Sequence, residues 1–292
     1  MKIVRFSPLQ RSGAARLGVL LGDGATVLDV GECGLRPPAA PNDAYDLDGN
    51  YLRDLLSLVS RGSYRSYAVI ERAKVRLLAP IERPGKVICV GLNYRDHAAE
   101  SKLPVPEQPV IFTKFPSCVI GPDEEIVLPP DSQKVDYEAE LAFVVGRRAS
   151  QIDVEDALEH VLGYTCVNDV SARDFQFQDV QWTRGKSCDT FCPMGEAIVT
   201  TDELGAAQDL RIRLHLNGQT LQDSRTSQLV FGVAEILSFL SRSFTLEPGD
   251  IIATGTPPGV GFARKPPVFL KGGDEVIVEI EGVGRLRNTV RA

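Results

Sequence analysis

The sequence lacks any apolar run long enough to cross a membrane. Its longest apolar stretches, such as residues 141–145, fall far short of the roughly 18 residues that a membrane span requires. The first six residues alternate polar and apolar side chains, and no long apolar segment of a signal peptide follows them. We therefore expect a soluble, cytoplasmic protein without a membrane partner.

Closely spaced cysteines and an excess of positive charge are also lacking. The closest pair among six scattered cysteines, Cys188 and Cys192, has three intervening residues instead of two. This spacing favours reduced thiols over a disulfide framework, a zinc knuckle or a thioredoxin-type site. The 32 Lys and Arg residues against 39 Asp and Glu residues give a net charge of −7. Nucleic acids and anionic membrane surfaces are therefore poor candidates for partners.

The length of 292 residues suggests two domains of about 150 residues each. We predict a small N-terminal α/β module over residues 1–80 and a larger domain over 81–292, with prolines near the boundary. In the first module, alternation and turn signals predict three strands, and apolar residues at helical spacing predict a helix that ends at Gly62. The predicted strands are 2–6, 15–21 and 26–30, and the helix carries Leu52, Leu55, Leu56 and Val59.

Beyond residue 80 the pattern is mostly that of strands. They are predicted over 86–91, 138–145, 164–168, 210–216, 250–254 and 275–280, with helices near 95–101, 153–162 and 233–240. Strands and helices do not alternate regularly, which argues against a doubly wound parallel sheet. We therefore predict an α+β fold that is predominantly β and built on antiparallel sheet.

Three carboxylates have sequence positions that fit a metal site. Glu138 and Glu140 are two residues apart at the start of a predicted strand, so their side chains share one face. A solvated strand edge would account for this pair equally well. A third carboxylate, Asp169, follows an apolar run and is placed at the end of a buried strand. Together the three form an all-oxygen site that suits Mg²⁺ or Mn²⁺, with Ca²⁺ as an alternative, and does not suit zinc.

Acid–base and charge-stabilising candidates lie in two further segments. His97 and Glu100 are three residues apart on a predicted helix, where a carboxylate beside an imidazole would make a general base for water. Chance proximity is the simpler explanation of this pair when it is taken alone. Lys186 follows Gly185 and would stabilise a carboxylate or a developing enolate from within a pocket, or else lie on the surface. His160 and His215 are interpreted as structural.

The glycine-rich segment 254–261 does not match a nucleotide-binding loop. It lacks the Gly-Lys-Ser/Thr ending of a phosphate-binding loop, and no helical pattern follows it. We interpret it as a rigid loop in which backbone amides and the Thr256 hydroxyl are placed to hold an anion.

Taken together, these segments resemble the fumarylacetoacetate hydrolase family, in particular its bacterial acylpyruvate hydrolases and 2-hydroxyhepta-2,4-diene-1,7-dioate isomerases. The resemblance covers about residues 80 to 290. Its ordered motifs are Gly91-Leu-Asn-Tyr-Arg-Asp-His-Ala-Ala-Glu100, Asp136-Tyr-Glu-Ala-Glu-Leu141, Asn168-Asp-Val-Ser-Ala-Arg-Asp174, Trp182-Thr-Arg-Gly-Lys186 and Gly255-Thr-Pro-Pro-Gly-Val-Gly261.

The resemblance implies a β-roll catalytic domain, a homodimer, and Mg²⁺ or Mn²⁺ held by the three carboxylates. It also implies that His97 and Glu100 lie on a lid over the substrate and that Lys186 completes the catalytic set. The positions expected to bind a small dioxo or oxo acid are Asn93, Tyr94, Arg173, Gln176, Gly255 and Thr256.

The resemblance further implies a metal-dependent hydrolase that cleaves a carbon–carbon bond in 2,4-dioxo acids such as acylpyruvates. The metal would stabilise the enolate that leaves, and His97 would activate water. Oxaloacetate decarboxylation and isomerisation of a dienedioate use the same enolate and remain as alternatives. A catalytically idle binding protein of the same fold is a further alternative.

Overall fold

The computed structural model describes residues 1–9, 14–22, 24–38, 40–62, 64–96 and 105–292. Its backbone is organised around a long mixed sheet with the order β4-β3-β2-β1-β15-β12-β11-β18-β6-β7, in which β5 also pairs with β1. In that order the strands are β4 (Val69–Glu71), β3 (Thr26–Asp29), β2 (Arg16–Leu20), β1 (Lys2–Pro8), β15 (Ile198–Thr200), β12 (Val161–Asn168), β11 (Ala139–Val145), β18 (Ile251–Ala253), β6 (Val87–Gly91), β7 (Val110–Lys114) and, beside β1, β5 (Val75–Leu78).

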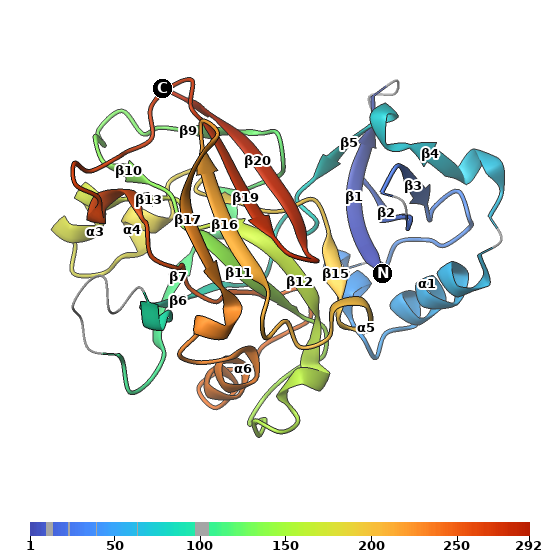
Figure 1. The fold of residues 1–292 in the computed structure, drawn as a ribbon. Coiled ribbons are helices and arrows are strands. Elements are labelled where there is room, and N and C mark those ends of the chain that lie inside the picture. The colour runs from blue at the N-terminus through green and yellow to red at the C-terminus, as the bar shows by residue number, and fades with distance from the viewer. Residues whose placement is uncertain (10–13, 23, 39, 63, 97–104) are drawn as a thin grey trace.

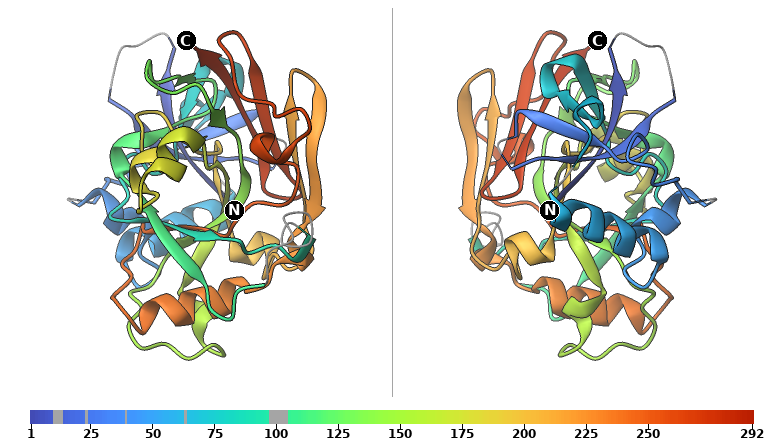
Figure 2. Two further views of the ribbon diagram at one scale, coloured as in Figure 1. Left: turned by 90° about the vertical axis from the view of Figure 1, so that its left-hand side faces the viewer. Right: turned by 90° about the vertical axis from the view of Figure 1, so that its right-hand side faces the viewer.

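A second sheet packs beside the central strands, as Figures 1 and 2 show. It consists of β17 (Gln219–Arg225), β16 (Arg211–Leu216), β19 (Glu275–Ile280), β20 (Gly284–Arg291) and β9 (Glu125–Val127), in that order. Two short pairs complete the strands of the described residues: β10 (Val135–Asp136) with β13 (Ser171–Ala172), and β8 (Val119–Ile120) with β14 (Cys192–Pro193).

The helices of the described residues are few and mostly short. The α-helices are α1 (Asn50–Arg61), α3 (Arg173–Gln178), α4 (Thr183–Lys186), α5 (Thr201–Leu204) and α6 (Val233–Ser241). Single 3-10 turns occupy η1 (Pro41–Tyr45), η2 (Ser66–Ala68), η3 (Arg72–Lys74), η4 (Pro116–Cys118), η5 (Ala157–His160), η6 (Thr226–Gln228) and η7 (Gly261–Ala263). None of the described helices is long and apolar enough to span a membrane.

The first 80 residues form their own group of strands and carry α1 beside them, on the right of Figure 1. Gly62 ends α1 in the left-handed conformation at φ 62°, a position that glycine occupies without the steric penalty of a side chain. Strand β1 also pairs with β15, which continues this group into the main sheet. The division at residue 80 remains a prediction.

The mostly-β architecture confirms the fold class, but one predicted helix is wrong. Within residues 153–162 the structure has the short 3-10 turn η5 and then the start of β12 at Val161, and no α-helix. The spacing of Ala157, Leu158, Val161 and Leu162 matches a helix face. However, Val161 and Leu162 lie in a strand that pairs on both sides, with β11 and with β15. Short apolar runs do not separate a buried strand from a helix by periodicity.

Two adjacent strands, β11 and β12, position the candidate site. All residues of both strands are buried, and β-branched and aromatic side chains make up much of them. Their antiparallel register places Glu140 opposite Val167 and Ala139 opposite Asn168. Because side chains alternate between the two faces of a sheet, this register determines where each carboxylate points.

Candidate active site

Glu138, Glu140 and Asp169 converge on one point in the interior. Glu138 immediately precedes β11, Glu140 lies within it, and Asp169 immediately follows β12. One carboxylate oxygen of each residue lies within 4.8 Å of the others, and all three residues are buried. The structure thus brings together the three carboxylates that the sequence predicts as a metal site, and the solvated-edge interpretation is wrong.

Three buried cations surround these carboxylates. The Lys186 ammonium donates to Glu138 Oε2 at 2.6 Å and to Asp169 Oδ2 at 2.7 Å. On the other side of Asp169, the Lys114 ammonium donates to Oδ1 at 2.6 Å. The Arg173 guanidinium donates to Glu138 Oε1 at 2.5 Å. Lys186 is only 2% exposed, which excludes the surface-lysine interpretation.

The two glutamates experience opposite electrostatic environments. Burial alone would raise the pKa of Glu138, but Arg173 and Lys186 outweigh this effect and lower the pKa to about 2. For Glu140, burial raises the pKa well above its usual value, and the charges of Asp169 and Glu138 raise it further. The Gly255 N–H donates to Glu140 Oε2 at 2.8 Å. A positive ion beside Glu140 would therefore relieve an unfavourable charge.

A cavity of about 490 Å³ opens onto Glu138 and Glu140. Six of the predicted site residues line it: Glu138, Glu140, Arg173, Gln176, Lys186 and Thr256. Its remaining wall is largely apolar, with Phe112, Phe177, Trp182 and Phe262 as its aromatic members. The site therefore combines a charged floor with an aromatic wall, an arrangement typical of small-molecule sites.

Three predicted substrate-binding residues, Asn93, Tyr94 and Gly255, are buried and do not line the cavity. Asn93 is 1% exposed, and its amide donates to the carbonyl oxygens of Phe231 and Thr254. Tyr94 is fully buried. Gly255 contributes its N–H to Glu140, as described above. The substrate-binding role of these three residues remains a prediction. His97 and Glu100, the predicted dyad, lie outside the described residues.

Sequence reasoning missed two charged residues of the site. Lys114 ends β7, and its side chain is completely buried. Asp136 accepts hydrogen bonds from Arg173 Nε and from the backbone N–H groups of Gly261 and Phe262. The sequence offers one lysine within the mostly apolar segment 110–116, a pattern that a solvent-facing lysine at a strand end would share. Asp136 fixes the orientation of Arg173, which in turn contacts Glu138.

Comparison with known proteins identifies this arrangement. The family model described as fumarylacetoacetate (FAA) hydrolase C-terminal matches residues 86–291. This chain belongs to the fumarylacetoacetate hydrolase family. The match confirms the resemblance seen in the sequence motifs.

Several relatives match nearly the whole chain. Oxaloacetate tautomerase FAHD2A, mitochondrial, of Bos taurus is 45% identical over 99% of this chain and 91% of its own length. Among solved structures, fumarylacetoacetate hydrolase from Exiguobacterium antarcticum is 41% identical, with a TM-score of 0.82, and 2-hydroxyhepta-2,4-diene-1,7-dioate isomerase from Mycobacterium marinum is 36% identical, with a TM-score of 0.77. Both comparisons cover all of this chain, and they cover 99% and 98% of those chains.

The buried residues fit the divalent metal that the sequence motifs imply for this member of the fumarylacetoacetate hydrolase family. The donor set consists only of oxygen atoms, which suits Mg²⁺ or Mn²⁺. The buried cluster contains four carboxylates (Asp136, Glu138, Glu140 and Asp169) against three cations (Lys114, Arg173 and Lys186), a formal charge of −1. A divalent ion would change this charge to +1, which an anionic substrate would balance.

Proposed function

We propose that this protein is an enzyme that interconverts the enol and keto forms of a 2-oxo dicarboxylic acid such as oxaloacetate. The observation that carries this proposal is the 45% identity to an oxaloacetate tautomerase over almost the entire length of both chains. The buried carboxylates and cations of the site supply suitable chemistry. Tautomerisation breaks a C–H bond and forms an O–H bond, or the reverse, and it requires neither a water nucleophile nor cleavage of a carbon–carbon bond.

In this proposal the residues of the chain hold the acid and its developing charge. Glu138, Glu140 and Asp169 would hold Mg²⁺ or Mn²⁺, which supplies Lewis-acid polarisation of the 2-oxo group. The Lys186 ammonium lies beside two of these carboxylates and stabilises negative charge on the enolate oxygen of the acid. Thr256 accepts a hydrogen bond from the Gln222 amide at 2.9 Å, which orients its hydroxyl group at the cavity wall.

The proton carrier in the proposal is His97, with Glu100 as the residue that orients it. An imidazole suits this role because it takes up and releases a proton near neutral pH. Homodimer formation and a cytoplasmic location also remain proposals for this chain.

Hydrolysis of a 2,4-dioxo acid is the second candidate function, and the size of the cavity favours it. A volume of about 490 Å³ lies well within the range of small-molecule sites, of about 300 to 1,000 Å³. A four-carbon acid would fill only part of this space. The aromatic wall formed by Phe112, Phe177 and Trp182 would suit the longer apolar chain of an acylpyruvate.

Two assays on the same Mg²⁺-loaded or Mn²⁺-loaded protein separate these functions. Loss of the enol absorbance of freshly dissolved oxaloacetate measures tautomerisation, and pyruvate release from an acylpyruvate measures hydrolysis. We expect the first rate to exceed the uncatalysed rate by a larger factor than the second. Faster hydrolysis would replace the proposal by the second candidate, and the absence of both activities would refute both candidates.

Lys186→Met tests the assignment of the site. We expect it to lower turnover by about 100-fold, because a positioned charge-stabilising donor contributes about 10²- to 10³-fold. Lys86→Met is the matched control, since Lys86 also pairs with an aspartate at 2.6 Å but is 36% exposed and lies outside the cavity. Equal turnover in the two variants would remove Lys186 from the mechanism.

His97→Ala tests the proton carrier. A general base contributes about 10²- to 10⁴-fold, so the proposal predicts a loss of this size in tautomerisation as well as in any hydrolysis. Loss of hydrolysis alone would limit His97 to water activation. Unchanged rates in both assays would remove His97 from the mechanism.

A further inference from the structure

Phe112 lies where the aromatic wall of the catalytic cavity meets its charged floor. It belongs to β7, is half-buried, and lines the cavity. Lys114 is two residues further along β7, so the two side chains share one face of the strand. Lys114 donates to Asp169 Oδ1, as described above. The second ammonium on Asp169, that of Lys186, lies over the Phe112 ring at 4.8 Å from the ring centre. One face of β7 therefore supplies one cation of Asp169 and contacts the other.

The segment that ends in Lys186 contacts this ring a second time, through Trp182. Trp182 immediately precedes α4, and Lys186 is the last residue of that helix. The Lys186 backbone N–H donates to the Trp182 carbonyl oxygen at 3.1 Å, and residues four apart on a helical turn are neighbours on one side of it. The rings of Trp182 and Phe112 meet edge to face, with centroids 5.4 Å apart and an interplanar angle of 65°. This contact holds the Phe112 ring in its orientation beside the ammonium.

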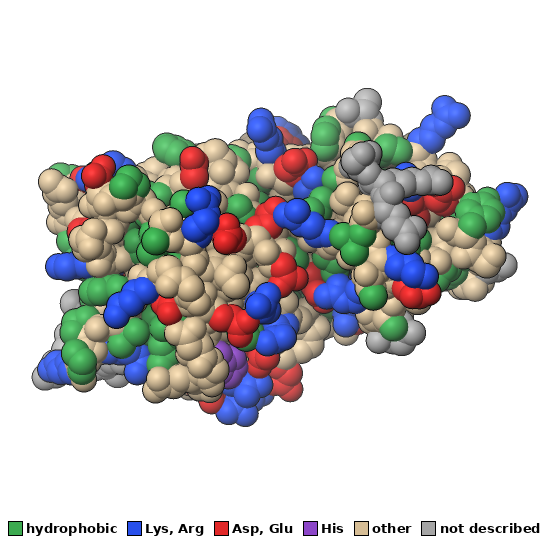
Figure 3. Space-filling model, turned by 90° about the horizontal axis from the view of Figure 1, so that it is seen from above, with side chains coloured by type: hydrophobic (Ala, Val, Ile, Leu, Met, Phe, Trp, Pro, Cys, Tyr) green, Lys and Arg blue, Asp and Glu red, His purple; other side chains and the backbone are tan. Residues whose placement is uncertain are grey.

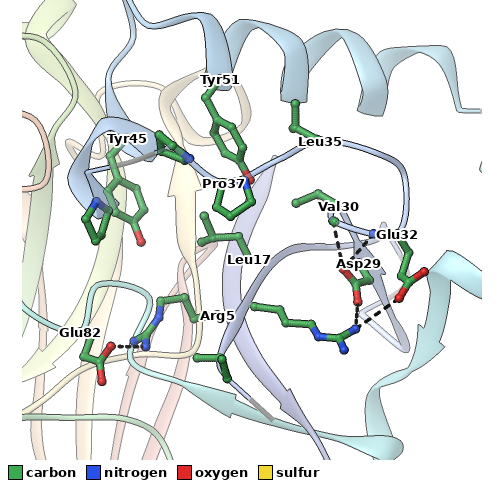
Figure 4. A pocket seen from close by; sticks show the side chains of 16 residues that line it. Arg5, Leu17, Asp29, Val30, Glu32, Leu35, Pro37, Tyr45, Tyr51 and Glu82 are labelled. Carbon is green, nitrogen blue, oxygen red and sulfur yellow. Dashed lines mark hydrogen bonds and ion pairs between the residues drawn. The ribbon is translucent and has the colours of Figure 1, made fainter.

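The ring lies where an exposed ammonium would have water. A lysine ammonium has three N–H groups, and two of those of Lys186 donate to Glu138 and Asp169. The Lys186 side chain is 3% exposed and its two carboxylate partners are at most 9% exposed, so little water reaches them. Arg5, which lines a separate cavity in the N-terminal module, shows the more usual arrangement (Figure 4). Its partner Glu82 is 72% exposed, so water solvates that ion pair.

We propose that Phe112 is a positioning residue that acts through Lys186, because the negative face of its ring binds the ammonium and keeps it at the cavity. The part of this inference that concerns turnover rests on the proposed function. An aromatic ring attracts a cation most strongly where water is excluded. Glu138 and Asp169 are also proposed metal ligands, so a bound ion would compete with Lys186 for their negative charge. The ring offers no oxygen ligand to Mg²⁺ or Mn²⁺ and therefore remains a partner of the ammonium.

Fluorinated phenylalanines in place of Phe112 test the contact itself in the full-length, metal-free protein. Each added fluorine makes the ring face less negative with little change in ring shape. In a chelator, we expect the melting temperature to fall stepwise from phenylalanine through its mono-, di- and trifluorinated forms. The same series combined with Lys186→Met should show no such trend, because the cation is absent. A trend that persists in Lys186→Met would come from the Trp182 contact and would overturn the proposal, as would the absence of a trend in both series.

Turnover of oxaloacetate tests the positioning role. Phe112→Leu removes the ring and keeps an apolar side chain, and we expect it to lower kcat about tenfold, within the range of a cation–π contact shielded from water. KM should change less than kcat, and kcat should also fall along the fluorinated series. Phe175→Leu is the matched control: the Phe175 ring lies 4.4 Å from the Arg184 guanidinium, but Arg184 is 51% exposed and neither residue lines the cavity. This control should leave kcat unchanged. A higher KM with unchanged kcat in Phe112→Leu would make Phe112 a substrate contact only and overturn its positioning role.

The two measurements separate this inference from the proposed function. A lysine-dependent trend in melting temperature, in a wild type that does not turn over oxaloacetate, would support the contact between ring and ammonium and refute the proposed function. Turnover by wild type that neither Phe112→Leu nor fluorination alters would support the proposed function and refute the positioning role of Phe112.

Discussion

Replacing Lys114 by Met should destabilise the metal-free protein by about 3–5 kcal/mol. The Lys114 ammonium lies 2.6 Å from Asp169 Oδ1, donates also to the Val170 carbonyl oxygen at 3.2 Å, and is completely buried. Methionine has a similar length, so the change removes charge with little change in packing. Asp169 keeps the Lys186 ammonium at its other oxygen, but Oδ1 loses its cation and the formal charge of the buried cluster falls from −1 to −2. This uncompensated negative charge accounts for the cost.

Lys86→Met provides the matched control for this measurement. Lys86 pairs with Asp250 at the same distance of 2.6 Å, but its side chain is 36% exposed and water can replace it. Asp250 itself is buried, but water can reach the position of the Lys86 ammonium, so we expect this change to cost less than Lys114→Met. The free energy of unfolding should be measured by urea titration in a chelator for wild type and both variants.

Repeating the titrations with saturating Mn²⁺ isolates the electrostatic origin of the effect. A divalent ion beside Asp169 would replace part of the lost positive charge, so the cost of Lys114→Met should be smaller with Mn²⁺ than in the chelator. Adding Asp169→Asn to Lys114→Met should also recover stability in the chelator, because it removes a buried negative charge that Lys114 no longer balances. The reasoning is refuted if the two lysine variants cost the same, or if neither Mn²⁺ nor Asp169→Asn reduces the cost.

Three further predictions concern the site. Glu140→Gln should abolish calorimetric Mn²⁺ binding. The folded-state pKa of Glu140 is raised, so its contribution to stability is lost as pH rises above about 4.5. The melting temperature of the metal-free wild type should therefore fall over this range, and that of Glu140→Gln should fall less. Glu138 has a lowered pKa of about 2, so its contribution to stability is lost as pH falls from about 4.5 towards 2. In the same measurement of melting temperature against pH, Glu138→Gln should show a smaller decrease in acid than wild type. Gly255→Ala should unfold at a lower urea concentration than the control Gly205→Ala. Both glycines have positive φ, but only at Gly255 would the new Cβ meet other atoms at 2.9 Å. Equal urea midpoints of unfolding for the two variants would contradict this.

The cluster of three carboxylates could be predicted because most of its signal is local. Glu138 and Glu140 have the two-residue spacing of one strand face, and Asp169 follows an apolar run of strand residues. The sequence does not show that β11 and β12 are neighbours, yet their pairing brings Asp169 to the two glutamates. The family motifs, and not the alternation of side chains along the strands, indicated that Asp169 belongs to the same site as the two glutamates.

Other parts of the site depend on contacts that leave no local pattern. Lys114 at the end of a strand is indistinguishable in sequence from a solvent-facing lysine, and its partner Asp169 lies 55 residues away. The aromatic wall draws on Phe177 of α3 and on Trp182, which immediately precedes α4, and these helices have six and four residues. Such helices are too short to show a helical period. Surface charges are equally uninformative, because acidic and basic side chains are interspersed on the face shown in Figure 3.

The separation between charged floor and aromatic wall has a consequence for how this enzyme can acquire new substrates. Glu140 lies on a strand that pairs on both sides, so a mutation that moves it also disturbs the sheet. Phe177 and Phe262 belong to short segments outside the sheets, and Phe177 is 64% exposed. Substitutions there reshape the cavity while the backbone beneath the carboxylates stays in place. Laboratory evolution aimed at these two phenylalanines should therefore yield folded variants that accept differently shaped acids and retain the proposed proton-transfer chemistry.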